Sequence, residues 1–155
     1  MKKSIFYYLF AVVCTVCLFT ACSNDDDDDN NKPSLTVDSI VGTYNGTLKI
    51  ESLGQSVEAP VTVTKVSDSK VTIGVTDLKV VGITVDPINV ECSIKKDADG
   101  NEFDIAGSGK AKITGIGEFP VTITGDADSK KMDIDIVVTD IPALGTLTVE
   151  FEGTK

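Results

Sequence analysis

The chain has 155 residues and a formal net charge of −10, and all 14 of its basic residues are lysine. An acidic chain without arginine lacks the clustered cations that bind phosphate, so nucleic acid is excluded as a partner. The chain also has no histidine, which excludes the Cys–His and Ser–His pairs of common nucleophilic enzymes.

Residues 1–21 have the pattern of a bacterial export signal. Lys2 and Lys3 precede an apolar run from Ile5 to Phe19, and small residues follow that run. A basic start, an apolar segment and small residues in this order are typical of a secretory signal peptide. The apolar run is shorter than the ~20 residues that a transmembrane helix needs, which disfavours an uncleaved membrane span.

The segment Phe19-Thr20-Ala21-Cys22 resembles the lipobox of bacterial lipoproteins. In that family the cysteine receives a diacylglycerol thioether, the peptide is cut before it, and the new amino group is acylated. The resemblance implies that Cys22 is the first residue of the mature protein and its anchor in the membrane. Several acyl chains together suffice for stable anchoring. We therefore expect the mature protein on the bacterial outer membrane, on its inner face or exposed at the cell surface.

Residues 22–39 are expected to form an acidic tether. The five aspartates from Asp25 to Asp29 repel one another and cannot bury apolar surface, so an extended, mobile segment is predicted. Its reach is about 25–55 Å. Two interpretations stay open, because a solvated spacer uses the same residues as the acidic signal that directs some lipoproteins to the cell surface.

Apolar and polar residues alternate from Val41 onward, and no segment has the period of a helix. Val, Ile and Thr dominate the alternating segments, and Gly, Asp and Ser separate them, which predicts strands joined by turns. The eight predicted strands are 42–51, 57–66, 70–77, 88–96, 102–113, 118–125, 131–139 and 145–152. Each has one apolar face, and no charge falls on it.

Short hairpins with one apolar face favour an all-β fold, an eight-stranded antiparallel up-and-down β-barrel without substantial helix outside the signal peptide. An open two-sheet sandwich is the alternative. A transmembrane barrel is disfavoured, because the mature chain keeps only four aromatic residues, too few for two interfacial girdles.

One short sequence recurs sixty residues later in the chain. Pro60-Val61-Thr62-Val63-Thr64, followed by Asp68-Ser69-Lys70, returns as Pro120-Val121-Thr122-Ile123-Thr124 with Asp128-Ser129-Lys130. The echo fits two four-stranded halves of one barrel, or two hairpins with similar demands that converged on similar residues.

Residues 40–155 resemble the calycin-like β-barrel domain of bacterial lipoproteins, which is distantly similar to lipocalins. The resemblance rests on strand order and on Gly42-Thr43-Tyr44, which opens the first strand where lipocalins carry Gly-X-Trp. Lipocalins pack an arginine of the last strand onto the tryptophan ring, whereas this chain has no arginine and ends without their C-terminal helix. The resemblance implies the fold and the anchoring.

The remaining motifs do not indicate chemistry. Asp97-Ala98-Asp99-Gly100-Asn101 is similar to a calcium loop, but Glu102 and Ser108 stand where the EF-hand pattern needs Gly and Glu, so a hairpin turn is predicted. Gly107-Ser108-Gly109 lacks the context of a nucleophile elbow, and its glycines are expected to relieve crowding in a long barrel strand or to bend it. Cys92 is expected to be a small core residue. We expect no catalytic residue, no metal, no cofactor and no enzymatic activity.

Apolar residues gather in the connections at one end of the predicted barrel. They are Leu53, Leu78, Val80, Val81, Ile83, Val85, Ile116, Ile141 and Leu144. Because loops that face water are ordinarily polar, these residues need burial.

These apolar connections have two interpretations. If they surround an entrance, the protein is a lipocalin-like lipoprotein that binds a small apolar ligand near Val81, Ile83, Ile141 and Leu144. If they form a plug, the barrel is a packed structural or interaction module that displays its surface to protein partners. In both cases the first strand begins at the opposite end, so the tether enters there.

Overall fold

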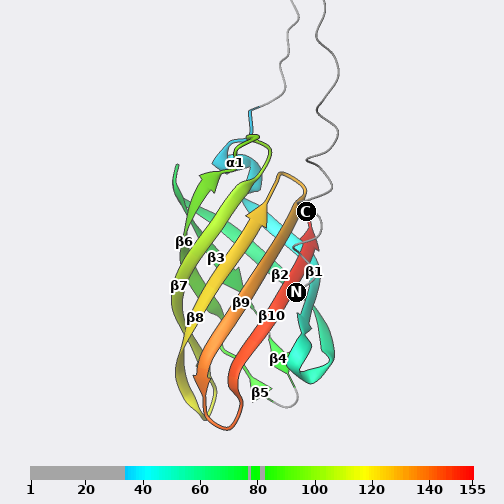
Figure 1. Cartoon of the computed structure of the whole chain (residues 1–155), viewed down its shortest axis with the longest axis vertical. Coiled ribbons are helices and arrows are strands. Elements are labelled where there is room, and N and C mark those ends of the chain that lie inside the picture. Colours follow the sequence, from blue (N-terminus) through cyan, green and yellow to red (C-terminus); the bar gives the residue numbers. More distant parts are fainter. Residues whose placement is uncertain (1–33, 77, 81–82) are drawn as a thin grey trace, which may run out of the picture. The chain divides into compact units, whose positions relative to one another are not determined.

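Eight antiparallel strands close into a single barrel in the computed structural model, which describes residues 34–76, 78–80 and 83–155 (Figure 1). In chain order these strands are β1 (Gly42–Ile50), β2 (Gln55–Ser67), β3 (Lys70–Val75), β6 (Ile88–Lys96), β7 (Phe103–Ile113), β8 (Gly117–Ala127), β9 (Lys131–Ile141) and β10 (Gly145–Thr154). Around the barrel the order is β1-β10-β9-β8-β7-β6-β3-β2, so β10 returns to pair with β1. The predicted up-and-down barrel is confirmed, and closure excludes the open sandwich.

Three short elements lie outside the barrel wall. Helix α1 (Val37–Ile40) precedes β1, and the 3-10 helix η1 (Glu51–Leu53) joins β1 to β2. A small sheet of β4 (Lys79–Val80) and β5 (Ile83–Thr84) lies in the connection between β3 and β6. Among the helices of the described residues, none is long and apolar enough to cross a membrane.

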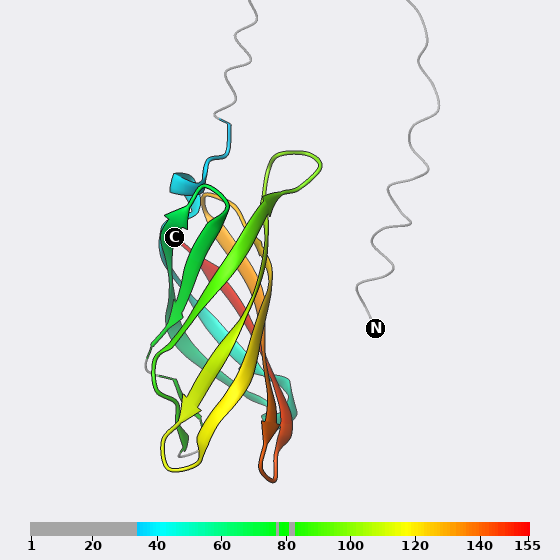
Figure 2. The same cartoon turned by 90° about the vertical axis from the view of Figure 1, so that its left-hand side faces the viewer.

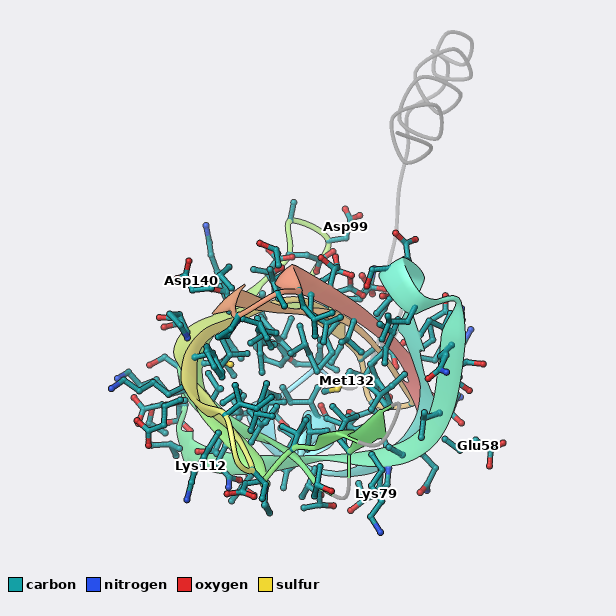
Figure 3. All side chains as sticks on the ribbon, turned by 90° about the horizontal axis from the view of Figure 1, so that it is seen from below. Glu58, Lys79, Asp99, Lys112, Met132 and Asp140 are labelled. Atoms are coloured by element: carbon teal, nitrogen blue, oxygen red, sulfur yellow. The ribbon has the colours of Figure 1, made fainter. Side chains whose placement is uncertain are left out.

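The alternation of the strands decides what lies inside the barrel. In β9, for example, Met132, Ile134, Ile136 and Val138 are buried, while the residues between them are more exposed. Seen along the barrel, Met132 points inward, whereas Glu58, Lys112 and Asp140 point outward (Figure 3). Within the described part of the chain no polar or charged residue is buried. The predicted inward faces are therefore confirmed.

The two ends of the barrel differ in their turns (Figures 1 and 2). We call the end with α1 and the β2–β3, β6–β7 and β8–β9 turns the proximal end. The distal end has η1, the β4–β5 sheet and the β7–β8 and β9–β10 turns. The described chain enters the barrel at the proximal end, as predicted.

Tyr44 closes the proximal end from inside. Its hydroxyl donates its proton to the carbonyl oxygens of Ile40 at 3.0 Å and Asp128 at 2.9 Å, which share it. The ammonium of Lys155 lies 5.6 Å from the centre of the Tyr44 ring and donates to the Ser39 carbonyl at 2.9 Å. A lysine that follows the last strand thus covers the Tyr44 ring. Burial, and then the charge of Asp128, raises the pKa of Tyr44 to about 12.

The folded unit begins before the predicted boundary at residue 40. The described residues from Ser34 onward belong to one compact unit. Val37 and Ile40 of α1 are buried in the core, and Leu35 packs against it. The end of the predicted tether 22–39 is therefore part of the barrel's proximal end, because its apolar residues cover the core there.

The echoed sequences have a common structural setting. Pro60 pairs with Asn45 of β1, and the ladder between β2 and β3 begins at the next residue, Val61. Pro120 likewise pairs with Lys110 of β7, and the ladder between β8 and β9 begins at Val121. A proline lacks an N–H group that it could donate to a neighbouring strand. Each proline therefore lies one residue outside the ladder with the following strand, β3 for Pro60 and β9 for Pro120. The repeated sequence thus occurs at two positions where pairing with the following strand begins one residue after a proline.

Candidate functional site at the distal end

The connection between β3 and β6 closes the distal end of the barrel. Leu78 and Val85 in this connection are buried, and the Val85 N–H donates to the Leu78 carbonyl at 3.0 Å. Val85 also forms a bridge with Ile113, the last residue of β7. The two apolar side chains are therefore held against the core, as the plug interpretation predicts.

A small apolar cavity remains beneath this plug. Its volume is about 30 Å³. It is lined by Leu48, Val75, Leu78, Val85, Ile88, Ala111, Ile113, Ile136, Val138, Ile141, Leu147 and Val149. A cavity of this size has room for one or two water molecules but offers them no polar partner, and sites for small-molecule ligands occupy about 300–1,000 Å³. The space beneath the plug is therefore too small for such a ligand.

The structure separates the residues that were predicted to contact a ligand. Ile141 is 3 % exposed and lines the cavity, whereas Leu144 in the β9–β10 turn is 45 % exposed. Ile83 lies in β5, where it pairs with Val80. Val81 and the predicted lipid attachment site Cys22 lie outside the described residues.

Two features of the distal turns were not predicted from the sequence. Asp140 and Ala143 have positive φ angles of 63° and 66°, a conformation that non-glycine residues rarely adopt. Ile116 in the β7–β8 turn is 47 % exposed and Leu144 is 45 % exposed, so the expected burial of these two residues is wrong. Positive φ has no strong signal in the sequence at these positions, because it is imposed by how the turn must close.

The outer wall formed by β7 to β10 carries directly opposed carboxylates. Asp104 pairs with Asp126, Asp126 with Asp133, and Asp133 with Glu152. Like charges in directly opposite positions of a sheet are destabilising. Burial, and then the charge of Asp126, raises the pKa of the nearby Glu102 carboxyl. Within the residues described, no acidic group has a geometry that could hold a metal ion.

The β6–β7 turn has the structure predicted for a hairpin. The Asp97 carboxylate accepts the N–H groups of Asn101 at 2.9 Å and Glu102 at 3.1 Å. Hydrogen bonds from the backbone, the one from Glu102 first, lower the pKa of Asp97. This aspartate is thus satisfied by its own turn.

Cys92 is buried on the inner face of β6, and burial raises the pKa of its thiol to about 11. A Cβ atom at Gly107 would overlap its sulfur, and one at Gly109 would lie 3.1 Å from a Val90 methyl group. The predicted roles of Cys92 as a core residue and of these glycines in relieving crowding are confirmed.

A closed barrel of eight antiparallel strands connected in sequence is an up-and-down β-barrel. The model of the family described as "Calycin-like beta-barrel domain" matches residues 40–154, and the chain belongs to this family. No curated protein matches the sequence.

Solved structures share the fold at low sequence identity. A Bacteroides fragilis NCTC 9343 protein, provisionally named an outer membrane protein, is 18 % identical with a TM-score of 0.56. The match covers 76 % of this chain and 51 % of that one, so this chain spans about half its length. A redesigned β-barrel is 13 % identical (TM-score 0.46, covering 79 % of this chain and 97 % of that one). EF1p2_mFAP2b bound to DFHBI is 14 % identical (TM-score 0.48, covering 79 % and 98 %).

Proposed function

We propose that the protein is a lipoprotein of the bacterial outer membrane, anchored through Cys22, whose packed barrel presents its outer surface to protein partners. The observation that carries the packed part is the small size of the apolar cavity beneath the distal plug, about 30 Å³. In this role the barrel is neither an enzyme nor a carrier. The membrane is its first partner, and a protein contacting the barrel surface is its second.

The anchoring part rests on the sequence around Cys22. A basic start, an apolar run and a cysteine after small residues form the pattern of a lipoprotein signal. The similar Bacteroides fragilis protein is itself named for the outer membrane, which supports this location.

The path of the chain supports the display of the barrel surface. The tether joins the barrel at α1, on the proximal end, where Lys65 contacts Asp38 at 3.1 Å and Lys155 contacts the Ser39 carbonyl. The distal turns lie at the opposite end of the barrel from α1, where the described chain enters (Figure 1). They are the surfaces on which a partner would bind.

Substitution of Cys22 tests the anchor. In cells that produce Cys22→Ser, we expect an uncleaved precursor that takes up no fatty-acid probe. Cys17→Ser, also in the predicted signal, is the matched control and should be cleaved and labelled like the wild type. Labelling of Cys22→Ser at the wild-type level would exclude Cys22 as the attachment site.

A second candidate function is the binding of a small apolar ligand at the distal end, favoured by the wholly apolar lining of the cavity. Titration of the whole chain with an environment-sensitive apolar dye separates the two. A packed barrel shows no saturable binding. Saturable binding that is lost in Val81→Asp with Leu144→Asp, but kept in the proximal variant Ser129→Ala, would instead establish a carrier.

A further inference from the structure

The ladder between β6 and β7 covers only the proximal half of these strands. It runs from Lys96 opposite Phe103 to Cys92 opposite Gly107. No cross-strand pair joins the next residues of β6, 88–91, to β7, although all of them are described. By contrast, β7 pairs with β8 along its whole length. We call the unpaired stretch between 88–91 and 108–111 the seam, on the side of the barrel that faces the viewer in Figure 2.

A change of register explains the seam. On the distal side of the seam, pairing with β7 resumes where Val85 forms a bridge with Ile113. Seven positions separate Val85 from Cys92, while six separate Gly107 from Ile113. The stretch from Val85 to Cys92 therefore has one residue more than the stretch that it faces in β7, as in a β-bulge. One continuous ladder cannot join the two paired regions. Pro87 lies within the longer side and has no N–H group to contribute.

Side chains close the seam in place of the missing ladder. A Cβ atom at Gly109 would lie 3.1 Å from a Val90 methyl group, so the two strands remain in contact. At the distal limit Asp86 joins the two sides. Its carboxylate accepts the Thr114 hydroxyl at 2.7 Å and lies 3.5 Å from the Lys112 ammonium, and its N–H donates to the Lys112 carbonyl at 2.9 Å.

The interior lies directly behind the seam. Ile88 on one side of the seam and Ala111 on the other both line the apolar cavity. Cys92, at its proximal limit, is fully buried. Parting of the strands here would expose the cavity wall and the thiol while the remaining strand pairs stay intact.

We propose that the β6–β7 seam is a gate, at which the barrel wall opens locally and exposes its apolar interior without global unfolding. Backbone hydrogen bonds hold the other adjacent pairs of barrel strands in ladders with shorter interruptions or none, whereas four consecutive residues of β6 lack a partner in β7. Local openings begin where the fewest such bonds must break. The gate does not depend on the anchor or on the proposed function.

The test is the alkylation of Cys92 by N-ethylmaleimide in the whole purified chain, followed by peptide mass spectrometry, which distinguishes Cys92 from the other cysteines. Global unfolding is followed by circular dichroism under the same conditions. A local gate exposes little surface, so 2 M urea should change the labelling rate by less than about threefold. Exposure through global unfolding would raise that rate by about 30-fold or more, and that result would overturn the proposal.

A pair of variants tests the location of the opening. Asp86→Ala removes the contacts to Thr114 and Lys112 and should speed Cys92 labelling about threefold to tenfold. Glu118→Ala is the matched control, because it removes the contact of Glu118 with Lys110 across the fully paired β7–β8 wall. It should change the rate by less than about twofold. Equal rates in the two variants would show that the wall does not open at the seam.

Discussion

Ile134→Ala is the most direct test of which face of the wall forms the core. Ile134 is fully buried in β9, between Gly125 of β8 and Phe151 of β10. A Cβ atom at Gly125 would lie 2.9 Å from an Ile134 methyl group, so the surroundings are tight and backbone lies close on that side. The site can therefore collapse only partly when the side chain is shortened.

The expected loss follows from this packing. The substitution removes three carbon atoms, and at ~0.8 kcal/mol per buried methylene the lost transfer free energy is about 2.4 kcal/mol. A residual cavity of roughly 50 Å³ adds ~1 kcal/mol at about 24 cal/mol per Å³. We expect the free energy of unfolding to fall by about 3–4 kcal/mol.

Urea titration monitored by circular dichroism measures this loss. The slope of the free energy of unfolding against urea concentration should be the same for the wild type and the variant. The matched control is the adjacent residue Asp133, which points outward and stands opposite Asp126 and Glu152. Asp133→Ala should change stability by less than about 0.5 kcal/mol. Similar losses in Ile134→Ala and Asp133→Ala would refute the assignment of the two faces.

Three further outcomes can be measured in the same way. Tyr44→Phe removes the hydroxyl that bonds to two carbonyl oxygens and should lower stability by about 0.5–1.5 kcal/mol, and no loss would show that α1 is held by other contacts. Gly107→Ala overlaps the Cys92 sulfur and should cost about 1–3 kcal/mol, more than Gly109→Ala, which meets only a methyl group at 3.1 Å. The pKa of Glu102 is raised in the folded protein, so folding is favoured by its protonated form, and this contribution is lost as pH rises through that pKa. Glu102→Gln should therefore raise stability at pH 7 relative to the wild type and converge with it in acid, and a parallel pH dependence would contradict this.

The strands and their inward faces could be predicted because they depend on local information. A strand places successive side chains on opposite faces, so the alternation in β6 or β9 already separates core residues from surface residues. Turn residues such as Asp97 and Gly100 act within a few positions of the chain. Apolar residues in the loop between β3 and β6 also indicated that the distal end needs burial.

The candidate site was predicted only in outline. Ile141 reaches the distal cavity, but Leu144, three residues later, is exposed because the turn reverses the chain between them. Whether apolar loop residues plug a barrel or surround an entrance depends on how much volume they fill. That volume depends on side chains from almost every strand, and no local pattern contains it.

By itself the sequence determined the eight strands, the apolar face of each, and the polar and apolar ends of the barrel. Only the tertiary structure decided that a cavity of about 30 Å³ remains beneath the distal plug, that Lys155 covers the ring of Tyr44, and that the wall is unpaired between 88–91 and 108–111. The physical reason is that side-chain alternation is a property of single strands. Register and packing are relations between segments distant in the chain. The extra residue between Val85 and Cys92, compared with the stretch from Gly107 to Ile113, becomes apparent only when those segments meet.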